Sequence, residues 1–191
     1  MKNILLVISG PAGSGKNTVS ERLMEEFPAI SRVVTSTSRP PRGAEKNGVD
    51  YHFLSRQDFE KGIADGDFYE YAKVHDRYYG TSKKAVLDAG GGDLILIIDV
   101  QGAATWRKIA QNHPEIRERL ATVFIAPATA DELRARLIGR NTETPQEIER
   151  RMQTAMDEFK QADKFDWRIL SKTKDEDFCA LKKIYLELKN K

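Results

Sequence analysis

Residues 10–16 read Gly-Pro-Ala-Gly-Ser-Gly-Lys and fit the pattern G-x-x-x-x-G-K. In such a glycine-rich turn, backbone N–H groups surround phosphate oxygens and the lysine neutralises their charge. The apolar segment 4–8 leads into the turn and a helical pattern leads out of it, so the first N–H groups of a helix point at the same anion. This context predicts a nucleotide-phosphate site. A dinucleotide fingerprint is excluded, because its third glycine would fall on Thr18.

The residue after the loop lysine departs from the usual pattern. A Ser or Thr hydroxyl normally ligates Mg²⁺ there, and this chain has Asn17 followed by Thr18. An amide oxygen is a competent ligand for a hard cation, so we expect Mg²⁺ at or beside Asn17. The predicted nucleotide-phosphate site comprises Gly10, Pro11, Ala12, Gly13, Ser14, Gly15, Lys16, Asn17 and Thr18.

A second group of anion-binding side chains lies between residues 35 and 84. Arg39 and Arg42 could grip a phosphate dianion through bidentate, charge-assisted hydrogen bonds, and the phenols of Tyr51 and Tyr79 could donate to the remaining oxygens. Two facing anion sites would hold a phosphoryl donor and a phosphorylated acceptor end to end. The alternative is that these arginines are ordinary solvated charges in a Pro-rich turn.

A third group consists of arginines in a charged helical segment. Arg136, Arg140 and Arg151 could stabilise the oxygens of a phosphoryl group during transfer, and Lys16 would act with them. The alternative is a solvated charged helix face, to which we assign Arg134 and Arg150. Thr144, Pro145 and Glu147 form a capping-box pattern that predicts where one of these helices begins.

Five short apolar segments predict strands that are buried on both faces: 4–8, 32–35, 94–98, 122–126 and 167–170. Helical patterns separate most of them, which favours parallel pairing in a doubly wound α/β sheet of five strands flanked by helices. Ligands of such sheets bind at the carboxyl ends of the strands. Asp99 follows one of these segments, where a buried carboxylate requires a partner.

Two stretches interrupt the alternation, and we interpret the chain as one domain with two insertions. The predicted core comprises 1–34, 85–126 and 158–191. The aromatic and basic stretch 35–84 is predicted to be an inserted acceptor-binding lobe, and 127–157 a mobile helical arm.

Composition narrows the class of protein. The 191 residues carry 31 Lys or Arg and 29 Asp or Glu, and this near-neutral balance argues against sequence-independent nucleic-acid binding. The single cysteine, Cys179, can form no intramolecular disulfide, which favours a cytoplasmic setting; we expect this thiol to be buried. The longest apolar runs have five residues, so no transmembrane helix or membrane partner is expected.

The chain resembles the guanylate kinases over essentially its whole length. The phosphate loop follows Ile8-Ser9 as in that family, and residues 35–42 with 47–53 are similar to its GMP-phosphate segment. Other stretches resemble the family's guanine pocket, its second strand-end motif and its lid: 68–72, 78–81, 98–102 and 136–140, with Arg151.

The resemblance implies the P-loop nucleoside monophosphate kinase fold with a GMP-binding lobe and a helical lid. It implies transfer of a phosphoryl group from ATP to GMP, giving ADP and GDP with Mg²⁺, and acceptance of dGMP. Guanine offers N1–H and its exocyclic amine as adjacent donors, which Glu70 could accept, while hydroxyls of Thr35 and Thr81 could donate to O6. Adenine would lose this match. The expected GMP-binding residues are Thr35, Arg39, Arg42, Tyr51, Glu70, Tyr79, Thr81 and Asp99.

Several alternatives stay open at this point. Asp99 could orient Mg²⁺ through water or accept from the guanine amine. The chain could be a catalytically silent module of the same family that binds a protein, or a kinase for another phosphorylated acceptor. It departs from the family at Ile97, where a second acid is common, and at Ser171, where relatives often carry Asn. A monomer and a homodimer are both compatible with the sequence.

Overall fold

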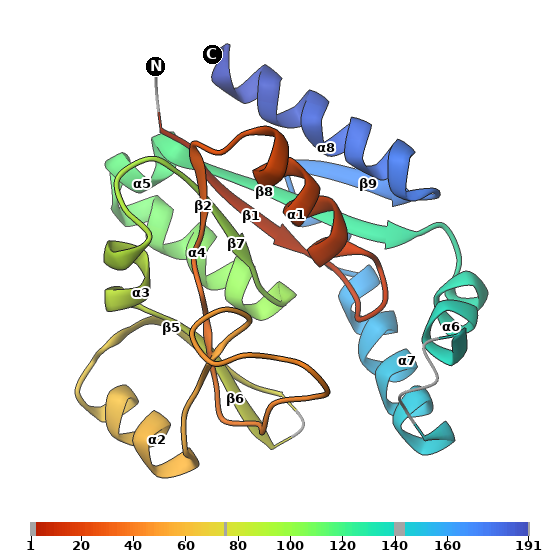
Figure 1. The fold of residues 1–191 in the computed structure, drawn as a ribbon, viewed down its shortest axis with the longest axis horizontal. Helices are drawn as coiled ribbons and strands as arrows, with labels where there is room; N and C mark the ends of the chain where they lie inside the picture. The colour runs from red at the N-terminus through yellow and green to blue at the C-terminus, as the bar shows by residue number, and fades with distance from the viewer. Residues whose placement is uncertain (1–2, 75, 140–143, 191) are drawn as a thin grey trace.

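The computed structural model describes residues 3–74, 76–139 and 144–190. Its central sheet has five parallel strands in the order β2-β7-β1-β8-β9 (Figure 1). Their bounds are β1 Leu5–Ser9, β2 Ile30–Arg32, β7 Asp93–Ile97, β8 Leu120–Pro127 and β9 Trp167–Ser171. The predicted five-stranded parallel sheet is therefore confirmed. Every residue of β1 is buried, as expected for a strand covered on both faces.

The second strand lies two residues earlier than predicted, so the predicted span 32–35 was wrong. β2 ends at Arg32, which pairs with Ile95. Val33 is buried and its N–H still donates to the Ile95 carbonyl at 2.9 Å, which explains why the apolar signal continues past the strand. The chain then enters a different sheet.

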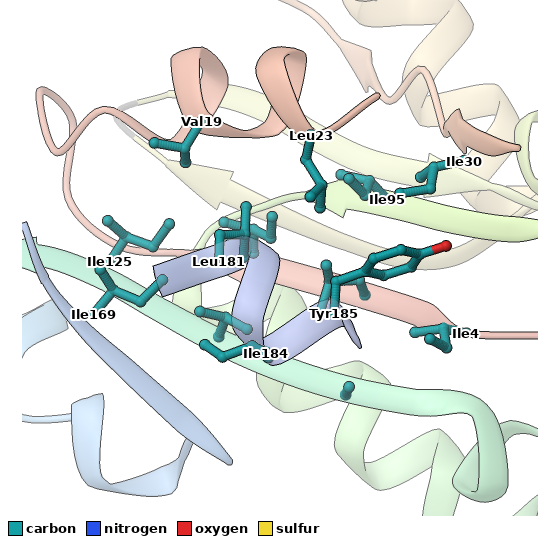
Figure 2. Close-up of a cluster of buried hydrophobic side chains, with 14 residues drawn as sticks. Ile4, Val19, Leu23, Ile30, Ile95, Ile125, Ile169, Leu181, Ile184 and Tyr185 are labelled. Atoms are coloured by element: carbon teal, nitrogen blue, oxygen red, sulfur yellow. The ribbon is translucent and has the colours of Figure 1, made fainter. Parts of the chain in front are cut away.

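The two faces of the central sheet carry separate clusters of apolar side chains. Successive residues of a strand point to opposite faces, so Leu6 and Ile8 pack on one side and Leu5 and Val7 on the other. Figure 2 shows the first cluster, in which side chains of α1 (Lys16–Glu26) and α8 (Lys174–Lys189) meet over the strands. Trp106 of α4 (Val100–Asn112) packs in the second cluster. Two short helices lie on this side: α5 (Pro114–Arg119) packs against α4, and α3 (Lys83–Asp88) contributes Ala85 to the second cluster.

A second sheet forms between β2 and α3. It contains four strands in the order β4-β3-β6-β5. Their bounds are β3 Ser36–Thr37, β4 His52–Phe53, β5 Phe68–Val74 and β6 Arg77–Ser82, and α2 (Arg56–Ala64) packs against β5 and β6. Phe59 of α2 is fully buried and stacks on Phe68 and Tyr78, with ring centroids 4.5 and 5.2 Å apart. This aromatic stack gives the small lobe its own core.

Two further helices, α6 (Ala130–Gly139) and α7 (Pro145–Phe159), pack against each other through a third apolar cluster. α7 begins at the predicted capping box: Thr144 accepts from the Glu147 N–H, and the Glu147 carboxylate accepts from Thr144. A 3₁₀ turn, Ala162–Lys164, leads to β9. The prediction that Cys179 is buried was wrong, because the side chain is exposed on α8. Within the described residues, no helix is long and apolar enough to span a membrane.

Candidate active site

The glycine-rich loop lies between β1 and α1, and its backbone conformation requires glycine. Gly10 has φ +137°, and a Cβ atom there would lie 2.0 Å from the Ile125 carbonyl oxygen of β8. Gly15 has φ 89° and is the N-cap of α1 without a capping side chain. The first turn of α1 begins at the cavity, since Lys16, Asn17 and Thr18 all line it. The loop thus brings backbone and a helix N-terminus to one surface.

The Lys16 ammonium is folded back over this loop. Its Nζ atom donates to the carbonyl oxygens of Gly10 at 2.6 Å and Pro11 at 2.9 Å. An entering phosphate would replace these carbonyls as the acceptor. The lysine therefore lies over the glycine-rich loop, where the sequence predicts that it binds an anion.

Arg39, Arg42, Tyr51 and Tyr79 line the same cavity from the second sheet and its loops. The Arg39 side chain is only 6% exposed, and its guanidinium carbon lies 5.0 Å from the Tyr51 ring centroid. The Tyr51 and Tyr79 rings meet edge to face with centroids 6.3 Å apart. Burial raises the pKa of the Tyr51 phenol, so it keeps its proton and remains a donor at neutral pH. The structure therefore brings the four predicted phosphate-binding side chains together.

One partner of Arg39 was not predicted from the sequence. Glu45 binds the Arg39 guanidinium with both carboxylate oxygens, at 2.6 and 2.8 Å, and also accepts from the Arg42 N–H at 2.7 Å. The Arg39 hydrogen bonds hold the pKa of Glu45 below its ordinary value, so this carboxylate is ionised at neutral pH. Glu45 is one acid in a polar turn, and its spacing from Arg39 carries no signal that could have identified it.

Glu70 of β5 is buried in the wall of the cavity. Thr81 of β6 donates its hydroxyl to Glu70 Oε1 at 2.5 Å. Burial raises the pKa of Glu70 to about 7, the Thr81 hydrogen bond opposes this, and the charge of Asp99 adds to it. Gly102 leaves room for the second carboxylate oxygen, since a Cβ there would lie 2.9 Å from Glu70 Oε2. The prediction that Thr81 donates to O6 of guanine was wrong, because its hydroxyl is fully buried and donates to Glu70, whereas Thr35 lines the cavity itself.

Asp99 lies between the two halves of the cavity, at the carboxyl end of β7. It is the N-cap of α4, and its Oδ1 accepts from the Gly102 N–H at 2.8 Å. Burial raises the pKa of Asp99, while hydrogen bonds from Gly102 and Gln101 and the positive charge of Lys16 oppose the rise. The carboxylate is thus within the electrostatic reach of the phosphate loop and of Glu70. Both of its predicted roles, towards metal or towards guanine, stay predictions.

A further carboxylate, Glu158 of α7, was missed in the sequence. It lines the cavity, and burial raises its pKa to about 7, with Lys16 lowering it and Asp99 raising it. The signal that could have found it is helical spacing, because Glu158 follows Arg151 by seven residues and so shares its face of α7.

The predicted catalytic arginines lie in different places. Arg151 lines the cavity, together with Arg150, which the sequence had suggested to be merely solvated. Arg136 donates instead to Ser171 Oγ at 2.7 Å and to the carbonyls of Ser171 and Lys172, at the carboxyl end of β9. Asp177 accepts from the same Ser171 hydroxyl at 2.5 Å. Arg140 lies outside the described residues. Contact of Arg136 or Arg140 with a transferred phosphoryl group stays a prediction.

The oxygen donors in the cavity fit Mg²⁺. Asn17 offers an amide oxygen beside Lys16, and Asp99 offers a carboxylate, which are hard ligands suited to this ion. Within residues 3–74, 76–139 and 144–190, no three His, Cys, Asp or Glu side chains form a metal-binding cluster. This set suits a cation that is held mainly by the phosphates of a nucleotide and only partly by protein.

One cavity of about 630 Å³ is bordered by most of these groups, namely Lys16, Asn17, Thr35, Arg39, Arg42, Tyr51, Glu70, Tyr79, Asp99, Arg151 and Glu158; Glu45, Thr81 and Arg136 lie outside its lining. The phosphate loop forms one end, and the Arg39 and Arg42 segment with Glu70 forms the other. The volume is in the range of small-molecule sites. The cavity can therefore hold two anionic groups at opposite ends with a carboxylate-lined wall between them.

Comparison with known proteins gives a consistent result. A family model described as "Guanylate kinase" matches residues 2–188. The guanylate kinase of Campylobacter jejuni (strain RM1221) is 39% identical over 189 residues, covering 97% of this chain and 89% of that protein. The guanylate kinase of Clostridioides difficile (strain 630) is 40% identical over 172 residues, covering 89% and 80%. The crystal structure of guanylate kinase from Anaplasma phagocytophilum matches with a TM-score of 0.77 and 28% identity, covering 97% of this chain and 86% of that one.

Proposed function

The chain belongs to the guanylate kinase family, and from this premise we propose that it transfers the γ-phosphoryl group of ATP to GMP, producing ADP and GDP. The observation that carries the proposal is the shared cavity. The loop that binds donor phosphates and the arginine and tyrosine cluster that binds an acceptor phosphate open into the same 630 Å³ space. Two nucleotides bound there would meet phosphate to phosphate.

Phosphoryl transfer needs positioning and charge neutralisation rather than a protein nucleophile. Loop N–H groups and Lys16 hold the donor phosphates, and Arg39, Arg42, Tyr51 and Tyr79 hold the acceptor phosphate, whose oxygen attacks in line. Arg151 faces the cavity from α7 and stabilises the transferring group. When bound, Mg²⁺ neutralises phosphate charge, and Asn17 and Asp99 are the residues that would hold it.

Guanine recognition rests on the buried wall of the cavity. An ionised Glu70 accepts from two adjacent donors on guanine, and Thr81 fixes the orientation of that carboxylate through its 2.5 Å hydrogen bond. Thr35 donates to O6. Adenine presents an acceptor where guanine has N1–H, so it would leave the buried carboxylate without a donor, a mismatch that such sites reject strongly. None of these contacts involves the sugar, so we expect dGMP to be accepted.

We further propose that residues 35–84 form the GMP-binding lobe, that 127–157 form the lid, and that the rest is the core. Closing the two insertions on the core would exclude water and so suppress ATP hydrolysis. A cytoplasmic location and a monomeric or homodimeric state complete the proposal.

A coupled assay tests the function. Purified protein receives ATP and Mg²⁺ with GMP, dGMP, AMP, UMP or CMP in turn, and ADP formation is recorded. Turnover with GMP and dGMP, at least about 10³-fold above that with AMP in kcat/KM, is expected. Lack of turnover with GMP would refute the proposal, and equal use of several bases would refute the assignment of the base pocket.

A further inference from the structure

The guanidinium of Arg39 uses only part of its hydrogen-bonding capacity within the described residues of the protein. A guanidinium has five N–H groups in one plane. Nη1 donates to Glu45 Oε2 at 2.6 Å and to the Pro40 carbonyl at 3.0 Å, and Nη2 donates to Glu45 Oε1 at 2.8 Å. Three of the five groups are thereby engaged. The remaining two, Nε–H and one Nη2–H, form the side edge of the guanidinium.

The Nε–H of this side edge is buried without an acceptor in the described part of the chain. Arg39 is 6% exposed, and its Nε atom is inaccessible to solvent and makes no hydrogen bond to any residue that the structure describes. Arg39 also lines the cavity beside Tyr51 and Tyr79. Buried donors normally have partners, so an unpartnered Nε–H on an arginine that lines a cavity, with an Nη2–H parallel to it, indicates a ligand with two acceptor oxygens.

Glu45 determines which edge of Arg39 is left for that ligand. Its carboxylate covers the end of the guanidinium with both oxygens, so the end cannot also bind an anion. The Glu45 Oε2 atom accepts in addition from the Arg42 N–H at 2.7 Å, and the Glu45 N–H donates to the Arg42 carbonyl at 3.0 Å. One carboxylate thus orients both arginine segments of the acceptor site.

We propose that Glu45 is a positioning residue for the acceptor phosphate: it holds Arg39 so that the Nε and Nη2 edge, rather than the end of the guanidinium, binds two phosphate oxygens. This inference rests on the proposed function, because GMP supplies that phosphate. Glu45 does not touch the nucleotide and acts through Arg39.

The charge of Glu45 makes the direction of the change in GMP affinity informative. The Glu45 carboxylate repels a phosphate dianion, so removing its charge without any other effect would strengthen GMP binding. Loss of the orientation of Arg39 would weaken binding. Glu45→Gln keeps the shape and one oxygen for the Arg42 N–H but cannot accept from both ends of the guanidinium. Weaker GMP binding in this variant can therefore come only from lost orientation.

The experiment measures the affinities of GMP and guanosine by calorimetry for the wild-type protein and for Glu45→Gln. We expect GMP to bind about tenfold more weakly to the variant and guanosine, which lacks the phosphate, to change by less than about twofold. In the coupled assay, the KM for GMP rises by a similar factor while the KM for ATP stays the same. Unchanged or tighter GMP binding, or an equal loss for guanosine, would overturn the proposal.

Two further variants separate positioning from a general effect on the lobe. Glu60→Gln is the matched control, because Glu60 accepts from Arg56 at 2.9 Å in the same lobe but does not line the cavity. It should leave GMP affinity unchanged. Arg39→Lys removes the planar edge. The double variant with Arg39→Lys and Glu45→Gln should bind GMP less than about twofold more weakly than Arg39→Lys alone. Additive losses would contradict action through Arg39.

The test also distinguishes the inference from the proposed function. If the wild-type protein binds GMP more tightly than guanosine but transfers no phosphoryl group, the proposed function fails, and the affinity comparison still decides the role of Glu45. If the wild-type protein gains no affinity from the phosphate of GMP, the positioning role is refuted too.

Discussion

The hydroxyl of Thr81 and the carboxylate of Glu70 form a 2.5 Å hydrogen bond between β6 and β5, inside the wall of the cavity. Because the hydroxyl donates, it occupies one oxygen of Glu70 and fixes the plane of the carboxylate. The second oxygen lies beside Gly102, the residue whose N–H binds Asp99. The residue proposed to recognise the base is thereby connected to the end of the central strand β7.

Glu70→Gln tests this arrangement directly. The amide presents a donor where guanine also has donors, so we expect kcat/KM for GMP to fall on the order of 100-fold, with a much smaller change for AMP. Steady-state kinetics with both nucleotides measure the ratio. Full retention of the preference for GMP would show that another residue distinguishes the bases.

The raised pKa of Glu70 predicts a pH dependence of base binding. Burial brings this pKa to about 7, so the carboxyl is largely protonated at pH 6 and largely ionised at pH 8. Only the ionised form accepts both guanine donors, and we expect guanosine to inhibit about tenfold more tightly at pH 8 than at pH 6. Guanosine avoids the titration of the GMP phosphate. The dependence should disappear in Glu70→Gln, and its persistence there would assign it to a different group.

Glu158 predicts a pH dependence of stability. Its pKa is raised to about 7 by burial, so the folded state favours the protonated form. Protonation of Glu158 therefore stabilises the folded state. This stabilisation is complete at pH values below the pKa that Glu158 has in the unfolded chain, and it is lost as the pH rises through about 7. When the pH is raised from 5 to 8, the free energy of unfolding of Glu158→Gln should therefore increase relative to that of the wild-type protein. We expect an increase on the order of 1 kcal/mol, because the side chain is partly exposed. Urea unfolding at both pH values measures it.

The exposed Glu149 of the same helix provides the control for that experiment. It pairs with Arg134 on the outside of α7, and this hydrogen bond lowers its pKa. Glu149→Gln should show no gain between pH 5 and pH 8. A gain of equal size in both variants would mean that the net charge of the helix, and not the burial of Glu158, is responsible.

Lys16→Ala should separate donor chemistry from acceptor binding. The ammonium belongs to the glycine-rich loop, whereas the residues proposed to hold the acceptor phosphate belong to the second sheet and its loops. We expect kcat to fall by at least about 100-fold, with the dissociation constant of GMP changed less than about threefold. A parallel loss of GMP affinity would show that the two ends of the cavity are not independent.

The fold and part of the site could be predicted because their signals are local. The strand Leu5–Ser9, the glycine-rich loop and the start of α1 are contiguous, and their geometry follows from short-range patterns. The pairing of Arg39 with Glu45 and the burial of Glu158 depend on how the loops and α7 pack against the rest of the molecule. The same holds for Arg136, whose acceptors lie 35 and 36 residues away at the end of β9. Residue type alone contains no information about such partners.

The close approach of α6 to the glycine-rich loop has a mechanical consequence. A Cβ atom on Gly13 would lie 3.2 Å from a methyl group of Leu137 and 3.5 Å from one of Leu133. The methyl groups lie against the backbone of Gly13, which has no side chain that could move aside. Any adjustment of the loop as it takes up an anion is therefore transmitted to α6 by contact, and through their common apolar cluster to α7, the helix that carries Arg151.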